Sequence, residues 1–147
     1  MKKLEYSITI NASPERVWEI ITGKETYGQW TSVFAEGSSA ETDWKKGSKA
    51  IFLNGEGQGM VSEIVDSIPG KFLSIRHLGE VKDGVEDATT YQGEEWGDAL
   101  ENYELEQVNG RTVWVVTLDM NDDYVDFMNN TWPAALEKVK DLSEQAK

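Results

Sequence analysis

A chain of 147 residues with a formal net charge of −13 is long enough for one domain with a sizeable buried core. The acidic balance argues against nucleic acid and against an anionic membrane surface as partners. The chain has no cysteine, which excludes disulfides and thiolate chemistry, and it shows no apolar run of signal-region or membrane-span length. We therefore expect a single cytoplasmic domain over residues 1–147.

The first 30 residues predict a strand followed by two short helices. Apolar and polar residues alternate over 3–10, as in a strand with one buried face. Ser13 followed by Pro14 favours a helix start, because serine caps free backbone amides and proline suits the first helical position. Gly23 is expected to end this helix, and residues 24–29 to add one or two turns before Trp30.

The middle of the chain has the composition and turn signals of a sheet. Strands are predicted at 40–44, 47–53, 58–68, 72–78, 100–108 and 112–120. Asn54-Gly55 and Asn109-Gly110 are hairpin signals, and Pro69-Gly70 marks another turn. Hairpins make neighbouring strands antiparallel. The predicted class is therefore α+β, with a curved sheet of about seven strands.

Residues 121–147 form the longest predicted element, an amphipathic helix with apolar residues in steps of three and four. Pro133 removes one backbone donor and crowds the preceding turn, but the apolar stripe keeps its phase, so we predict one kinked helix. Residues 135–142 would then pack on the sheet. The kink would tilt three side chains of the first third over an opening: Tyr124, Phe127 and Met128.

Four segments, 8–18, 59–64, 69–75 and 132–139, carry a resemblance to a known family. The most specific pieces are Ala-Ser-Pro-Glu-Arg-Val-Trp in the first and Trp-Pro-Ala-Ala-Leu in the last. In this order they resemble the SRPBCC superfamily, the START-like helix-grip fold, and within it the bacterial relatives of the activator of Hsp90 ATPase. The resemblance implies a sheet gripping the last helix, with a cavity between them that often takes an apolar small molecule. It implies no reaction, because fold does not fix function.

The resemblance and the positions of the aromatic residues together define a candidate ligand-binding set. Alternation places Tyr103 and Trp114 beneath the terminal helix, where such residues form either a solid core or a cavity wall. His77, the single histidine, shares a predicted strand face with Ile75. It suits a general base or a ligand partner, and its alternative is a polar strand-end residue satisfied by a neighbour. The candidate ligand-binding residues are Trp30, Ile75, His77, Tyr91, Trp96, Tyr103, Trp114, Phe127, Met128 and Trp132.

The acidic stretch 79–98 is the longest segment without a predicted helix or strand. It lacks the alternating ligand rhythm of a calcium loop, which favours a solvated loop over a metal site. We expect Tyr91 and Trp96 to fold back over the cavity mouth, with part of the stretch adding a strand. Glu63 is a candidate for an inward carboxylate, although pairing with a basic side chain or a backbone amide is favoured over catalysis.

Three functions from different classes remain open. The first is a protein that binds an apolar or aromatic small molecule, with no catalysis, metal or cofactor, as a monomer or weak homodimer. The second is a protein-interaction module, by analogy with the Hsp90-activating relatives, whose acidic surface would meet a chaperone or another protein. The third is an enzyme acting on a hydrophobic substrate, with His77 as the base and a carboxylate such as Glu63 beside it.

Overall fold

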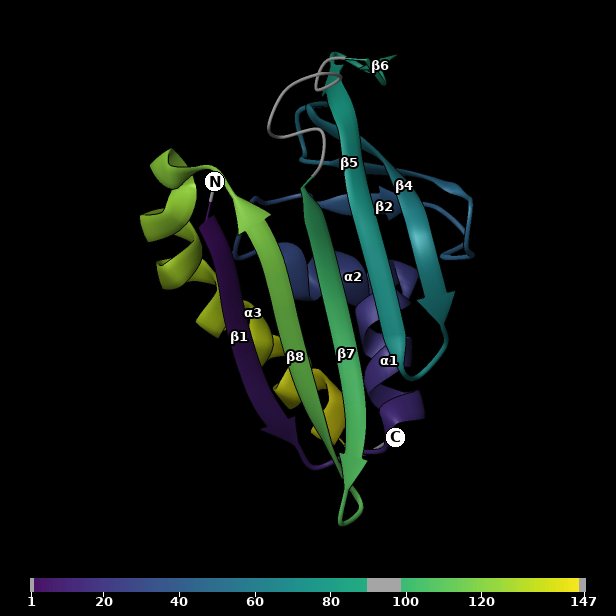
Figure 1. Cartoon of the computed structure of the whole chain (residues 1–147), viewed down its shortest axis with the longest axis vertical. Coiled ribbons are helices and arrows are strands. Elements are labelled where there is room, and N and C mark those ends of the chain that lie inside the picture. Colours follow the sequence, from purple (N-terminus) through teal and green to yellow (C-terminus); the bar gives the residue numbers. More distant parts are fainter. Residues whose placement is uncertain (1, 90–98, 146–147) are drawn as a thin grey trace.

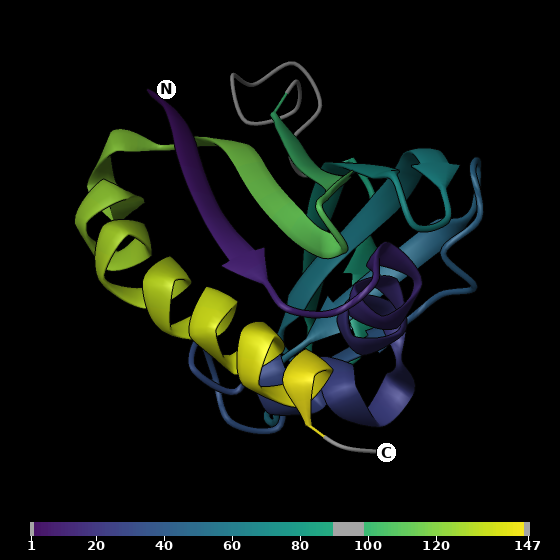
Figure 2. The ribbon, with the colours of Figure 1, turned by 90° about the horizontal axis from the view of Figure 1, so that it is seen from below.

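The computed structural model describes residues 2–89 and 99–145. The strands are β1 (Lys2–Ile10), β2 (Ser39–Glu41), β3 (Lys49–Leu53), β4 (Gly59–Ile68), β5 (Phe72–Lys82), β6 (Val85–Asp87), β7 (Leu100–Val108) and β8 (Arg111–Met120). They form one antiparallel sheet in the order β1-β8-β7-β5-β4-β3-β2, and β6 pairs with the end of β5. The helices α1 (Pro14–Thr22), α2 (Lys24–Thr31) and α3 (Val125–Glu144) lie on one face of this sheet (Figure 1, Figure 2). The predicted α+β helix-grip fold is confirmed.

Helix α1 begins as predicted, because the Ser13 side chain accepts a hydrogen bond from the Arg16 backbone amide at 3.2 Å. It also ends at Gly23, but for a reason other than a left-handed cap. Gly23 has φ −66°, and a Cβ there would lie 2.5 Å from the Thr26 hydroxyl oxygen and 2.6 Å from the Glu19 carbonyl oxygen. Glycine is therefore required at this position because a larger side chain would collide with the end of α1 and the start of α2.

Two strand predictions differ from the structure. The strand expected at 40–44 is β2 at Ser39–Glu41, and Trp44 has left-handed backbone with φ 61°, which takes it out of any strand. Strand β5 continues four residues past its predicted end at Leu78. Asp83 and Gly84, both at positive φ, then turn the chain back into β6. Part of the acidic stretch does add a strand, as expected.

Helix α3 follows a short 3₁₀ turn, η2 (Asp122–Tyr124), and continues through Pro133 as one helix that lies beneath β1 (Figure 2). Its two halves differ in burial. In the first half Tyr124 is 58% and Phe127 47% exposed. The buried residues of the helix are Trp132, Ala135, Leu136, Val139 and Ser143. The second half thus packs on the sheet as predicted, and the first half is more exposed. Within the described part of the chain, no helix is long and apolar enough to cross a membrane.

The C-terminal end of α3 is fastened to the start of α1. The Arg16 guanidinium donates to the carbonyl oxygens of Leu142, at 3.2 Å, and Ser143, at 3.4 Å. These carbonyls have no partner further along the helix, and a cation is favoured at this end of the helix dipole. The Asn11 backbone amide donates to the Glu144 carboxylate at 2.8 Å. These contacts hold the second half of α3 in place.

Candidate functional site

A cavity of about 340 Å³ lies between the sheet and the helices α2 and α3. Its walls come from α2 and the loop after it, from β3, β4, β5, β7 and β8, and from the first half of α3. The helix α2 therefore contributes as much wall as the terminal helix does. The lining side chains used below are Tyr27, Trp30, Phe34, Ala35, Trp44, Phe52, Met60, Ile75, His77, Glu101, Tyr103, Asp119, Met120, Phe127, Met128 and Trp132.

The structure brings most of the predicted site residues together at this cavity. Those that line it are Trp30, Ile75, His77, Tyr103, Phe127, Met128 and Trp132. Trp114 is fully buried and does not line the cavity. It stands behind the wall, edge-on to Trp30 at 5.8 Å and to Tyr103 at 5.6 Å between ring centroids. Tyr91 and Trp96 lie outside the described residues.

Three aromatic residues that the sequence did not single out form one wall. The ring centroids of Tyr27, Trp44 and Phe52 lie 5.9 to 6.0 Å apart, and Phe52 meets His77 edge-on at 6.2 Å. Tyr27 stands three residues before Trp30 on α2, a spacing that places both on one helix face and could have identified it. The inward position of Trp44 depends on its left-handed backbone, for which the sequence carries no signal.

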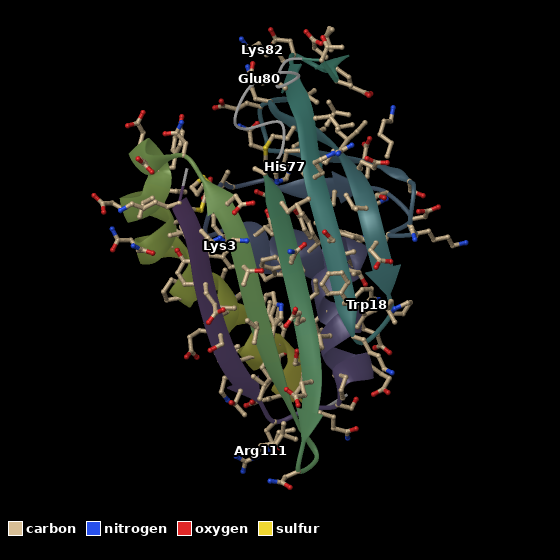
Figure 3. The ribbon with its side chains drawn as sticks, in the orientation of Figure 1. Lys3, Trp18, His77, Glu80, Lys82 and Arg111 are labelled. Atoms are coloured by element: carbon tan, nitrogen blue, oxygen red, sulfur yellow. The ribbon has the colours of Figure 1, made fainter. Side chains whose placement is uncertain are left out.

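His77 sits on β5 (Figure 3) as part of a buried polar group and is 5% exposed. Its Nδ1 lies 2.7 Å from the Ser62 hydroxyl oxygen, and its Nε2 lies 3.4 Å from Glu101 Oε1. A carboxylate only accepts hydrogen bonds. In the neutral ring Nε2–H therefore donates to Glu101, and Nδ1 accepts from Ser62.

Glu101 is a charged cavity residue that the sequence did not single out. It lines the cavity, and its other oxygen, Oε2, accepts a hydrogen bond from the Tyr103 hydroxyl. Alternation could have found it, since Glu101 is two residues before Tyr103 and so shares its inward face. Burial raises the pKa of the Tyr103 phenol, and the negative charge of Glu101 raises it further. The same two causes, in the same order, raise the pKa of the Tyr27 phenol.

Glu63 is not an inward carboxylate. It pairs with Arg76 across β4 and β5, with 3.0 Å between Oε1 and Nη2, and both side chains are more than a third exposed. This agrees with the expected pairing with a basic side chain. The carboxylate within reach of His77 is therefore Glu101 and not Glu63.

The contacts among Ser62, His77 and Glu101 resemble a nucleophilic triad only in composition. Ser62 is fully buried and does not line the cavity, so a bound molecule would not reach its hydroxyl. Its hydrogen bond instead holds the His77 ring in one orientation. Among the described residues, no group of three or more His, Asp or Glu side chains is arranged to hold a metal ion. The geometry offers an apolar chamber with a few placed polar groups.

Comparison with known proteins gave a family and several similar structures. The family model described as "Activator of Hsp90 ATPase homolog 1-like protein" matches residues 11–144. No curated protein matches the sequence. The solution structure of the Aha1 dimer from Colwellia psychrerythraea is similar at a TM-score of 0.75 and 22% identity, covering 100% of this chain and 99% of that one.

Two further solved structures share the fold. Protein MLL2253 from Mesorhizobium loti is similar at a TM-score of 0.71 and 15% identity, covering 99% of each chain. CalU16 from Micromonospora echinospora is similar at a TM-score of 0.64 and 14% identity, covering 94% of this chain and 71% of that one. At these identities the likeness is one of fold alone.

Proposed function

The chain belongs to the activator of Hsp90 ATPase homolog 1-like family, and from that premise we propose that it binds an apolar or aromatic small molecule in the cavity between its sheet, α2 and α3. The observation that carries this proposal is the cavity of about 340 Å³. A well-packed protein interior has few voids larger than a water molecule. A space of this size falls within the range of ligand pockets, which begins near 300 Å³.

The character of the walls supports an apolar ligand with one polar end. Aromatic rings cover α2, β3 and the first half of α3, and His77, Glu101 and Tyr103 form one connected polar group in the lining. The other polar side chains of the lining are Thr31, Ser38, Asn54, Gln58 and Asp119. Ligand sites commonly combine such apolar walls with a small number of placed hydrogen-bonding groups. The aromatic walls would supply most of the affinity for the ligand, and the polar group would set the orientation in which the ligand binds.

Binding without turnover is the form of this proposal that the contacts favour. Every polar side chain of the group already has a partner: Ser62 holds His77, and Glu101 accepts from His77 and Tyr103. An enzyme of the kind considered above would require His77 to accept a proton from substrate. In the neutral ring the nitrogen that could accept it, Nδ1, is turned toward buried Ser62.

The experiment is native mass spectrometry of gently purified protein, followed by organic extraction of any bound molecule. We expect a population heavier than the bare chain that loses a small apolar compound on activation. The control is the variant Ala35→Leu, which adds side-chain volume at the wall and should carry less of the compound. Bare mass in every preparation, together with no saturable binding of apolar probes, would contradict the proposal.

A second candidate is a protein-interaction role, including self-association. It is supported by two exposed aromatic side chains at the start of α3, Tyr124 and Phe127, and by the dimer formed by the Colwellia protein of the same fold. Exposed apolar groups that lie together often mark interaction surfaces. Light scattering after size exclusion should give a dimer mass that the double variant Tyr124→Ser with Phe127→Ser returns to monomer. Monomer mass at every concentration would remove the homodimer.

A further inference from the structure

The Glu101 carboxylate faces the cavity, and no lysine or arginine of the described residues lies within ion-pair distance of it. Within residues 2–89 and 99–145, the only basic side chain within ion-pair distance is His77, at 3.4 Å, and no Lys or Arg is that close. The sequence of 90–98 contains no Lys or Arg either. Charged groups removed from bulk water are normally paired. A carboxylate of this kind in an apolar chamber therefore favours a ligand that brings a positive charge.

The geometry leaves room for that partner on the carboxylate itself. Two ionised oxygens offer about four acceptor positions. Tyr103 uses one on Oε2 and His77 uses one on Oε1. These two contacts fix the carboxylate in place, and its remaining acceptor positions are unused by the described residues. The side chain of Glu101 is 20% exposed, so it is partly screened from water yet open to the cavity.

The aromatic wall next to this carboxylate favours the same kind of ligand. Tyr27, Trp44 and Phe52 line the cavity, and Phe52 packs edge-on against His77, which contacts Glu101. Aromatic faces attract organic cations, with the largest effect when the cation is desolvated. Asp119 also lines the cavity, but its carboxylate lies 3.7 Å from the Lys3 ammonium and accepts a hydrogen bond from the Leu100 backbone amide at 3.1 Å. Anionic ligands such as fatty acids would be repelled by the Glu101 carboxylate.

We propose that the ligand of this cavity is an apolar amine, whose protonated nitrogen pairs with Glu101 while its hydrocarbon or aromatic body rests on the Tyr27, Trp44 and Phe52 wall. This inference rests on the proposed function and narrows its ligand class. Tyr103 and His77 then act as positioning residues that orient the carboxylate, and Ser62 orients His77 in turn.

The test uses three probes with one aromatic body: naphthylmethylamine, naphthylmethanol and naphthoate. They differ in carrying a positive, a neutral and a negative polar end at neutral pH. Calorimetric titration of the full chain should give the order amine, alcohol, acid, with the amine tighter than the alcohol by at least about tenfold. The preference should persist at about 500 mM salt, which screens attraction to the acidic surface.

Two variants locate the effect. Glu101→Gln keeps the size and a hydrogen-bond acceptor but removes the charge, and it should bring amine and alcohol within about threefold of each other. Glu104→Gln removes the same charge from the exposed outer face of the same strand, and it should leave the preference unchanged. Thermal unfolding of each variant checks that it is folded. If Glu101→Gln does not fold, the order of the three probes on the unaltered chain still decides the question.

The outcomes separate this inference from the proposed function. If the alcohol or the acid binds as tightly as the amine, or if Glu101→Gln keeps the preference, the inferred ligand class is wrong. The proposal of small-molecule binding is then unaffected. If none of the probes binds and nothing co-purifies with the chain, both proposals fail. Tight amine binding that disappears at high salt would identify attraction to the acidic surface and would also overturn the inference.

Discussion

The two halves of α3 border differently packed parts of the protein interior, one solid and one hollow. The second half meets α1 and the lower sheet in a solid core, where Val17, Val116, Ala135 and Val139 are fully buried. The first half meets α2 and the upper sheet around a cavity, with Phe127 47% exposed at its edge. Solid packing at one end supplies the stability that allows the other end to stay hollow. Trp132 marks the border, since it belongs to the core cluster and also lines the cavity.

The largest expected difference between the halves comes from truncating one side chain in each. Leu136→Ala in the solid half should lower the free energy of unfolding by about 2–5 kcal/mol, because it removes buried contacts and leaves a void. Phe127→Ala in the hollow half should cost about 1 kcal/mol or less, because that ring is half exposed. Urea unfolding measures both. Equal losses would show that the two halves are packed alike.

Enlarging an alanine in each half tests the same contrast in the other direction. Ala135→Leu adds volume to a fully buried site and should destabilise the fold by about 1–3 kcal/mol. Ala35→Leu adds the same volume at the cavity wall, where there is space, so the stability should change by less than about 0.5 kcal/mol. Thermal unfolding gives both values. A large cost at Ala35 would mean that the cavity is not available to a side chain.

The latch between α1 and the end of α3 should make a smaller contribution. Arg16→Ala removes the two hydrogen bonds to the Leu142 and Ser143 carbonyls and should cost about 1–2 kcal/mol. Arg16→Lys keeps the charge and should recover part of that loss. Lys46→Ala, in the exposed turn before β3, removes an equal charge and serves as the control. A similar loss of unfolding free energy in both alanine variants would show that Arg16 acts through its charge alone and not through its hydrogen bonds to α3.

Stability measured as a function of pH should report on the polar group of the cavity, through the Tyr103 phenol. Burial and the charge of Glu101 raise the pKa of the Tyr103 phenol. Above about pH 10, the unfolded chain releases the tyrosine proton while the fold retains it. The unfolded state then binds fewer protons, so stability falls as pH rises. Tyr103→Phe has no phenol at that position and should lose less stability between about pH 9 and about pH 12. An identical alkaline decline in both proteins would contradict this cause.

Much of the fold follows from sequence because its signals are local. Alternation of apolar residues located the inward faces of β5, β7 and β8, and Asn109-Gly110 located their last hairpin. The last four residues of β5, 79–82, do not follow from the sequence, because Gly79 and the acidic residues after it have the composition of a loop. That segment is a strand because it pairs with β4 on one side and with β6 on the other, contacts that local composition does not report.

The cavity-lining residues were harder to predict from the sequence than the fold. Alternation predicts which face of the sheet a side chain occupies, but not whether that side chain reaches the cavity or stays behind its wall. Trp114 and Tyr103 share the inward face, yet only Tyr103 reaches the cavity. Which of them does so depends on how far α2 and α3 stand from the sheet, which no single strand encodes. The alternation in β7 also places Glu101 on the inward face, but a charged residue is not expected at inward positions, so the sequence alone does not single it out. The carboxylate predicted to lie beside His77 was Glu63, which in the structure lies on the outer face of the sheet and pairs with Arg76.

Methyl NMR of the methionine and isoleucine side chains during titration with naphthylmethanol would test the central claim most directly. Met60, Met120, Met128 and Ile75 line the cavity, whereas Ile20 and Ile21 belong to the solid core. If the hollow half binds apolar molecules, the first four methyl signals should shift and saturate together while the two core isoleucines stay fixed. Shifts spread equally over both groups, or no saturable shift at Met60, Met120, Met128 and Ile75, would contradict the account.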